Sequence, residues 1–211
     1  MPTEATAKRR GRKGNPEARR QAILEAAIDL FLAQGFAATT LDAIAAQAGV
    51  AKGTSYLYFA DKEALFRALV QDRVGPVIGE AEAAAPAFAG PFSVLLRQLV
   101  LGFVRQVLQT DRRRLLQLVL TEAPRFPWLA EIYWQEVVSR ALATIRAVAG
   151  QAHARGELAS DALERFPQLV PAPLLVGFLW TTLFQRFEPL DLEAFVQSYV
   201  DILLRGLEAK P

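Results

Sequence analysis

The chain has 211 residues, of which 52% are hydrophobic, and a net charge of +2. A chain of this length buries on the order of 70% of its unfolded surface and can form one large or two small domains. It has no cysteine, which excludes a disulfide framework, a thiolate zinc site and a cysteine nucleophile. Because no run of about 18 apolar residues occurs and the basic N-terminus lacks the apolar segment of a secretory signal, we expect a cytoplasmic protein that neither spans nor binds a membrane.

The first segment, residues 1–16, is rich in positive charge, glycine and proline. Within residues 8–20, seven Lys or Arg face a single acidic residue, Glu17. Residues 1–62 carry a balance of +3, whereas residues 63–211 carry −1. We expect residues 1–16 to form a disordered basic arm. Such an arm either follows DNA phosphates or a minor groove, or is a solvated tail.

Residues 39–62 predict two short helices joined at a glycine. Thr39 or Thr40 is placed to cap the first helix, and its apolar positions share one face. Those positions are Leu41, Ile44, Ala45 and Ala48. Gly49 follows where a helix ends in a left-handed residue, and a second helix of about two turns is expected to run to Phe59. This is the layout of a helix-turn-helix whose second helix enters a DNA major groove.

From Arg20 to Phe66 the chain resembles the DNA-binding domain of the tetracycline-repressor (TetR) family of bacterial transcription regulators. The matching elements are Arg20-x-x-Ile23-Leu24, Ala27-x-x-Leu30-Phe31, Gly35-Phe36, Thr39-Thr40-x-x-x-Ile44-Ala45, Ala48-Gly49-Val50, Lys52-Gly53-Thr54-x-Tyr56-x-Tyr58-Phe59 and Lys62-Glu63-x-Leu65-Phe66. Two positions depart from the family pattern. Ala51 replaces a capping Ser or Thr, which weakens the cap by about 1 kcal/mol, and Ser55 replaces a leucine that packs.

The second helix of the motif supplies most of the side chains expected to contact DNA. Lys52 is the candidate for a base-edge contact, because lysine donates to guanine O6 and N7. Gly53 lets the backbone approach the groove closely. The resemblance implies phosphate contacts from Thr40 and from Lys62, which follows a capping Asp61. The full predicted DNA-binding set is Arg20, Thr40, Lys52, Gly53, Thr54, Tyr56, Leu57, Tyr58 and Lys62.

Taken singly, these residues have less specific interpretations. A lone lysine is more often a solvated surface charge, and we expect Phe59 and Phe66 to belong to the core. Tyr56 has two open interpretations: its ring packs inside and offers only its hydroxyl, or it contacts DNA. The joint placement of these residues is what indicates DNA binding.

After Lys62 the apolar spacing predicts helices throughout. They are expected at about 62–83, 91–109, 111–122, 127–154, 168–187 and 191–208, separated by prolines and glycines. Val74-Gly75-Pro76 is expected to kink or end the first of them. No alternating strand pattern occurs, so we predict an all-α fold. It comprises a helix-turn-helix domain over residues 17–66 and a larger helical ligand-binding and dimerisation domain over residues 67–211.

The resemblance also implies an apolar ligand pocket and a dimer interface in the second domain. Candidate ligand-binding residues are Phe103, Val119, Trp128, Trp134 and Phe178, each of which is individually more typical of plain core. The last two long helices are apolar over more than one face, as a helix that also packs on a partner would be. The predicted interface residues are Leu175, Phe178, Leu179, Thr182, Leu183, Arg186, Tyr199, Ile202 and Leu203.

These features predict a dimeric transcriptional repressor that a small hydrophobic ligand releases from a palindromic operator. Its expected partners are double-stranded DNA, an effector molecule and a second copy of the chain, with no cofactor or metal. An enzyme is disfavoured, because no phosphate-binding glycine loop or metal-ligand cluster occurs and His153, the single histidine, has no evident partner. A helical adaptor that binds protein is the other alternative, which the salt dependence of nucleic-acid binding would distinguish.

Overall fold

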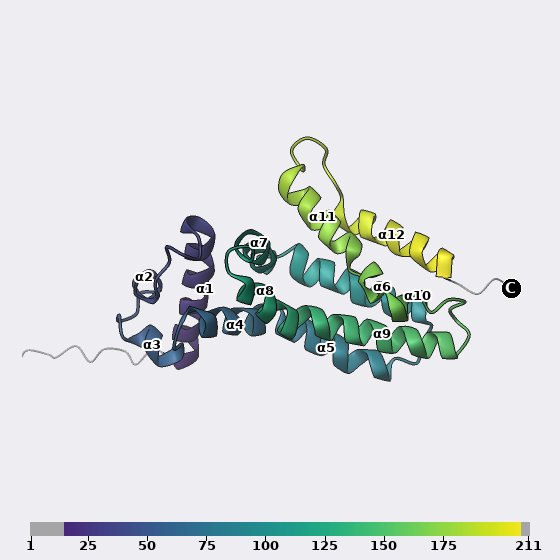
Figure 1. The fold of residues 1–211 in the computed structure, drawn as a ribbon, viewed down its shortest axis with the longest axis horizontal. Coiled ribbons are helices and arrows are strands. Elements are labelled where there is room, and N and C mark those ends of the chain that lie inside the picture. Colours follow the sequence, from purple (N-terminus) through teal and green to yellow (C-terminus); the bar gives the residue numbers. More distant parts are fainter. Residues whose placement is uncertain (1–14, 208–211) are drawn as a thin grey trace, which may run out of the picture. The chain divides into compact units, whose positions relative to one another are not determined.

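The computed structural model describes residues 15–207, and every regular element over this range is a helix (Figure 1). The prediction of an all-α fold is therefore confirmed for the described residues. The chain divides into two compact units, the first ending at Leu65 and the second beginning at Phe66. Most of the expected basic arm, residues 1–14, lies outside the described range.

The first unit contains helices α1 (Pro16–Gln34), α2 (Leu41–Gln47) and α3 (Thr54–Tyr58) and the start of α4 (Lys62–Arg73). Asn15 caps α1, because its side chain accepts a hydrogen bond from the Glu17 amide at 3.0 Å. Proline suits the first turn of a helix, where its missing N–H is not needed, and Pro16 is the first residue of α1. Pro16, which was expected to be part of the arm, therefore belongs to α1.

The core of the first unit joins α2 to the helices on either side of it in the chain. Helix α2 packs against both α1 and α3. Phe31 and Phe36 stack at the end of α1, with ring centroids 4.6 Å apart. Phe59 is also buried, as predicted. The other large buried side chains here are Ile23, Leu24, Ile28, Leu41, Ile44 and Leu65.

The second unit contains the rest of α4 and a set of helices interrupted by two π-helical segments. In chain order these are α5 (Gly75–Ala87), α6 (Phe92–Phe103), the π segment Val104–Leu108, α7 (Arg113–Glu122), α8 (Pro127–Tyr133), the π segment Trp134–Val138, α9 (Ser139–Ala154), α10 (Ala162–Arg165), the 3-10 turn Pro167–Leu169, α11 (Ala172–Leu183) and α12 (Leu192–Leu207).

These boundaries confirm one expectation and correct others. The break expected at Val74-Gly75-Pro76 divides the helix expected over residues 62–83 into α4 and α5, with Pro76 in the first turn of α5. Helix α11 is shorter than expected at both ends: it begins after Pro171 and ends at Leu183. The short α10 and both π segments were not predicted.

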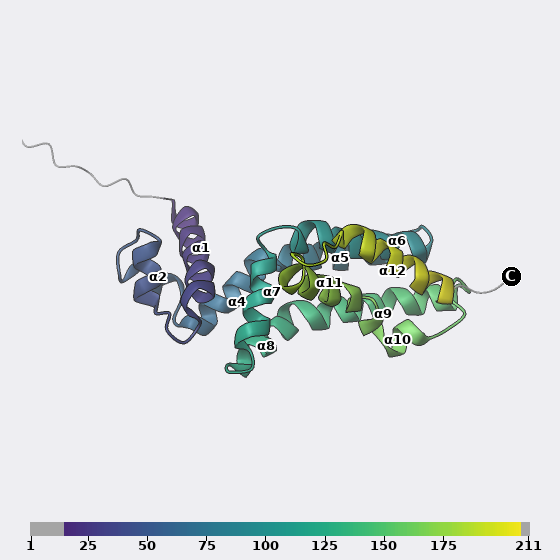
Figure 2. The same ribbon diagram turned by 90° about the horizontal axis from the view of Figure 1, so that it is seen from above.

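Helices distant in the sequence lie side by side in the second unit (Figures 1 and 2). Helix α5 packs against α9, and α12 packs against both α11 and α6. Charged side chains reinforce these contacts: Arg140 of α9 donates from Nε to Glu82 of α5 at 2.9 Å, and Arg97 of α6 pairs with Asp201 of α12. These two charged pairs therefore join helices that also pack against each other.

Helix α4 is held within the second unit through one carboxylate. Glu136 Oε1 accepts from Arg67 Nη1 at 2.9 Å and from Gln71 Nε2 at 3.2 Å. Glu136 belongs to the π segment Trp134–Val138. One oxygen thus joins two consecutive turns of α4 to that segment.

The described helices and their polar side chains bear on three further expectations. Over residues 15–207, none of the helices combines the length and apolar character needed to cross a membrane. His153 is exposed, as expected, but the expectation that it lacks a partner is wrong, because its Nδ1 lies 2.8 Å from Glu164 Oε1. Within the described range no cluster of three acidic, histidine or cysteine side chains is placed to hold a metal ion.

Candidate nucleic-acid interface and ligand cavity

Thr40 and Gly49 define the start and the end of α2. The Thr40 hydroxyl oxygen accepts from the Ala43 amide at 3.1 Å, so Thr40 is the cap. Thr39 is instead buried, and its hydroxyl donates to the Gly35 carbonyl at 2.8 Å. Gly49 has φ +66°, a conformation that glycine adopts without steric cost. It reverses the chain so that the Val50 amide donates to Ala45.

Helix α3 is shorter than expected and begins without a side-chain cap. It has five residues, with Gly53 rather than Ala51 at the N-cap, and it ends before Phe59. Lys52, which was predicted at the start of this helix, therefore precedes it. Ser55 is fully buried at the place where the resemblance leads one to expect leucine. Its hydroxyl lies within hydrogen-bonding distance of the Leu41 and Lys52 carbonyls, at 3.4 and 3.3 Å. The serine therefore links α3 to α2 through a satisfied polar contact.

The exposed face of α3 carries an aromatic and an aliphatic side chain next to a lysine. Tyr56 and Leu57 are 52% and 85% exposed, and Lys52 and Gly53 are also exposed. The structure thus places the Tyr56 ring outward and excludes the alternative in which it packs inside. Because large apolar side chains lose favourable burial when they face water, this group is suited to contact a partner.

Several of the predicted DNA-binding groups already have partners inside the first unit. Lys52 Nζ lies 2.8 Å from Asp42 Oδ2, and this hydrogen bond raises the pKa of Lys52. The Tyr58 hydroxyl donates to the Pro16 carbonyl at 3.1 Å. Arg20 pairs with Glu17. Asp42 was not singled out from the sequence, and its position in the first turn of α2, ten residues before Lys52, was the available signal.

Lys62 is directed into the fold. Its ammonium donates to the Phe36 carbonyl at 2.7 Å and lies 4.5 Å from the centroid of the Phe36 ring. Partial burial lowers its pKa. A phosphate contact from Lys62 would have to share or replace these bonds. The remaining predicted residues, Thr40 and Thr54, are exposed and partly exposed, and the Thr40 O–H is still free to donate.

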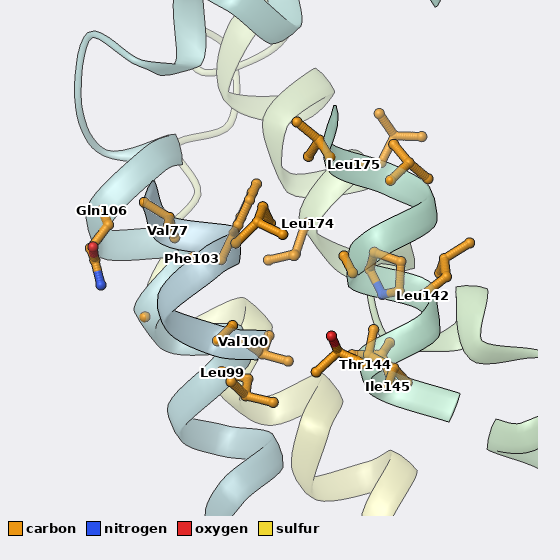
Figure 3. A pocket seen from close by; sticks show the side chains of 18 of the residues that line it. Val77, Leu99, Val100, Phe103, Gln106, Leu142, Thr144, Ile145, Leu174 and Leu175 are labelled. Carbon is orange, nitrogen blue, oxygen red and sulfur yellow. The ribbon is translucent and has the colours of Figure 1, made fainter. Parts of the chain in front are cut away.

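A cavity of about 760 Å³ lies within the second unit. Figure 3 shows its apolar wall, to which α5 contributes Val77, α6 contributes Leu99, Val100 and Phe103, α9 contributes Leu142 and Ile145, and α11 contributes Leu174 and Leu175. Such mostly apolar concave spaces are typical of small-molecule sites. The two π segments border it as well, because Gln106 and Val137 line the cavity.

The structure brings only part of the predicted ligand-binding set to this cavity. Phe103 and Val119 line it, whereas Trp128, Trp134 and Phe178 do not. The Trp128 ring packs edge-on against Phe66, and Trp134 is 53% exposed. Phe178 is buried beneath the Arg113 guanidinium, 5.3 Å from its ring. The predictions for these three residues are therefore wrong for this cavity.

The polar groups of the cavity wall are few. Tyr133, the last residue of α8, is buried, and burial raises the pKa of its hydroxyl. The Thr144 hydroxyl donates to the Arg140 carbonyl at 3.1 Å. The other polar lining residues are Glu80, Gln98, Gln106 and Gln168, all of them exposed. None of the described residues that line the cavity is lysine, arginine or histidine.

The predicted interface residues divide into an exposed group and a buried group. The exposed group is Leu175, Leu179, Thr182, Leu183, Arg186 and Ile202. Phe178 is only 2% exposed, so its assignment to the interface is wrong for a partner docking on the surface. Tyr199 and Leu203 are partly buried, and the Tyr199 hydroxyl donates to the Leu169 carbonyl. Phe184 and Phe187, after the end of α11, extend the exposed apolar surface and were not predicted.

Two family profiles match the two parts of the chain. Residues 23–69 match bacterial regulatory proteins of the tetR family, and residues 90–203 match the tetracyclin repressor-like C-terminal domain. Among curated proteins, the HTH-type transcriptional regulator AcrR of Shigella flexneri is 37% identical over 114 residues, which is 52% of each protein. The chain spans about half the length, or less, of the curated relatives it matches.

Solved structures share the fold over nearly the whole chain. The SmeT–triclosan complex aligns with a TM-score of 0.75 and 23% identity, covering 92% of this chain and 93% of that one; SmeT is the repressor of the multidrug efflux pump SmeDEF of Stenotrophomonas maltophilia. NalD, the secondary repressor of the MexAB-OprM multidrug efflux pump of Pseudomonas aeruginosa, aligns with a TM-score of 0.68 and 23% identity, covering 93% and 100%. At 23% sequence identity, this structural similarity shows that the fold is shared and nothing further.

Proposed function

Because the chain belongs to the TetR family of bacterial regulatory proteins, we propose that it is a homodimeric repressor that releases its operator DNA when a small hydrophobic molecule binds. The observation that carries this proposal is the presence of an exposed recognition helix in one unit and an apolar cavity in the other. Such a regulator acts in the cytoplasm, where the DNA is.

DNA binding is supported by the surface of α3 and by Lys52, which lies just before it. Lys52 is the proposed base contact, because it is exposed and lysine reads guanine in the major groove. Tyr56 supplies a hydroxyl, and Leu57 an apolar contact for a thymine methyl. Thr40 contributes a phosphate contact, which fixes register rather than sequence. Lys62 has a smaller part than the sequence suggests, since its ammonium is bound to the protein.

Dimerisation is supported by the exposed apolar surface of α11 and α12. Leu179 and Leu183 on α11, Phe187 after it and Ile202 on α12 are between 39% and 70% exposed. A contiguous exposed apolar surface marks an interaction site. A two-fold dimer would present two copies of α3 to half-sites about one DNA turn apart, or a multiple of it, as a palindromic operator requires.

Release is supported by the cavity and by linkage. A ligand shifts DNA affinity only as far as it binds the DNA-free state more tightly than the DNA-bound state. Two relatives of this fold are a complex with triclosan and a regulator described as flavonoid-responsive. Triclosan and flavonoids are small organic molecules of the kind that a cavity with an apolar wall can hold.

The DNA-binding part is tested by titrating the full chain onto its own upstream DNA at several salt concentrations. Lys52→Ala should weaken binding by about tenfold or more and lower the salt slope by about one. Arg125→Ala removes the same charge from an exposed position of the second unit and should change neither. Equal losses in the two variants, or salt-insensitive binding, would contradict the assignment of α3.

The ligand part is tested by filling the cavity from α9. Ala141 lines the cavity, whereas Ala143 is exposed on the same helix and does not. Ala141→Trp should abolish the thermal shift that small apolar compounds produce, together with their release of DNA. Ala143→Trp should preserve both. A compound that still releases DNA from Ala141→Trp acts at another site.

A further inference from the structure

Tyr133 brings an unused hydrogen-bonding group to the apolar wall of the cavity. It lines the cavity and is 7% exposed. Within residues 15–207 its hydroxyl has no hydrogen-bond partner. Buried tyrosine hydroxyls usually find a partner. An unpartnered one beside a cavity therefore points to a ligand atom.

Protein does not fully enclose the Tyr133 hydroxyl. It is not among the polar atoms that protein fully encloses without a partner, a group that includes Asp42 Oδ1 and Glu122 Oε2. Tyr133 lines the cavity and is otherwise buried, so the cavity is the open space beside it. A bound molecule that reaches this end of the cavity meets a phenol.

The phenol is a donor at neutral pH. Burial disfavours the charged phenolate and raises the pKa of Tyr133 above its ordinary value of 10.0. The group therefore stays protonated and offers an O–H to an acceptor. It offers no positive charge.

The rest of the wall disfavours an anion. No lysine, arginine or histidine of the described chain lines the cavity, and its one charged lining residue is the exposed Glu80. A carboxylate or phosphate entering this space would lose its hydration without gaining an opposite charge. The exposed amides of Gln98 and Gln106 do not supply that charge.

We propose that the cavity binds an uncharged, mostly apolar molecule whose oxygen acceptor receives the Tyr133 O–H, and that it rejects carboxylates and phosphates of similar shape. Ketones, ethers and esters are members of this class. The regulatory role of such a ligand rests on the proposed function, whereas its binding does not.

Binding of 2-decanone and decanoate to the full-length protein, measured by calorimetry at pH 7, tests this inference. The two probes have the same carbon count but differ in charge. The ketone should bind at least about tenfold more tightly than the carboxylate, because the anion loses solvation without compensation. Absence of ketone binding, or tighter binding of decanoate, would overturn the proposal.

Two matched variants isolate the hydroxyl. Tyr133→Phe should weaken ketone binding by about three- to tenfold, the effect of one lost hydrogen bond. Tyr199→Phe, which removes a hydroxyl bonded to the Leu169 carbonyl in the same unit, should leave it unchanged. Circular dichroism confirms that both variants are folded. Equal ketone affinity in wild type and Tyr133→Phe would exclude the hydroxyl as the anchor.

A DNA-binding measurement with the same ketone separates this inference from the proposed function. If the ketone binds through Tyr133 but leaves operator affinity unchanged, the release mechanism fails and the site stands. If the ketone releases DNA equally from wild type and Tyr133→Phe, the site fails and the release mechanism stands.

Discussion

Lys52 and Asp42 form an ion pair across the helix-turn-helix, with Nζ 2.8 Å from Oδ2. Both side chains are at least partly exposed, and Lys52 is the proposed base contact. If Lys52 makes the proposed base contact, its ammonium must exchange one partner for another. Asp42, in the first turn of α2, would then compete with the DNA for this lysine.

Removing that competitor should tighten DNA binding. Asp42→Asn keeps the shape of the side chain but frees Lys52 and removes a negative charge from the DNA-facing surface. Because exposed ion pairs contribute little, the gain should be roughly two- to fivefold in affinity, largest at low salt. Fluorescence anisotropy with operator DNA measures it. Glu63→Gln, which makes the same charge change in the first turn of α4, is the control. Weaker binding by Asp42→Asn would mean that Asp42 positions Lys52 for its contact.

The left-handed Gly49 should tolerate substitution poorly for a backbone reason alone. Nothing lies within 4 Å of where a Cβ would stand at this position, so a side chain meets no steric obstacle. Gly49→Ala should still destabilise the protein by about 1–2 kcal/mol, and Gly49→Asn by less. Urea unfolding followed by circular dichroism measures the change. Gly206→Ala, inside α12 with equally open surroundings, should be neutral or stabilising. A neutral Gly49→Ala would contradict the strain.

Glu157 should stabilise the second unit in a pH-dependent way. Its Oε2 accepts from the Phe92 amide, the first of α6, at 2.6 Å. This bond, and then that from Arg155, lowers the pKa of Glu157 below its ordinary value of 4.5. A lowered carboxyl pKa stabilises the fold in full above the ordinary value, and the stabilisation is lost as pH falls through the lowered one.

The Glu157 prediction is checked by unfolding wild type and Glu157→Gln between pH 7 and pH 3. The variant should be less stable by about 1 kcal/mol at pH 7, and the difference should shrink as the pH falls below 4.5. Glu131→Gln, at an exposed position of α8, should show no such pH dependence. A constant difference across the range would indicate that the charge of Glu157 is not what matters.

A charge on the exposed face of α12 should break the proposed dimer. Ile202 is 70% exposed in the protomer, and a carboxylate buried there in a dimer would be unpaired. Ile202→Glu should weaken dimerisation by at least about tenfold, as measured by light scattering across a dilution series. Val94→Glu, at an exposed apolar position of α6, should leave the dimer intact. An unchanged dimer in Ile202→Glu would place the interface elsewhere.

Most of the fold could be predicted from sequence because helices here are bounded by local signals. Thr40, Gly49 and Pro76 act within a few residues of where they stand, and they mark real boundaries in the structure. The two π segments were missed because each adds a residue to an otherwise helical run. At Trp134, for example, the carbonyl accepts from Ser139, five residues on, and no residue type announces this.

The sites were less predictable because they depend on contacts between distant residues. Trp128, Trp134 and Phe103 are alike as apolar aromatics, but one packs on Phe66, one faces solvent and one lines the cavity. Lys62 is bound by a carbonyl 26 residues away. What distinguishes Tyr133 is its burial beside the cavity, which its sequence position does not indicate. Spacing along a helix determines which face a residue occupies, but not what covers that face.

The carboxylate of Glu136 contacts α4 at Arg67 and Gln71, so α4 can tilt about this point. Arg67 lies five residues, or about 7.5 Å of helix axis, from the first residue of α4. A tilt of about 10° around the Arg67–Glu136 bond therefore moves that first residue by roughly 1 Å. Glu136 stands three residues after Tyr133, in the π segment that borders the cavity. If a bound ligand displaces the cavity wall, the Arg67–Glu136 contact is where that displacement would act on α4.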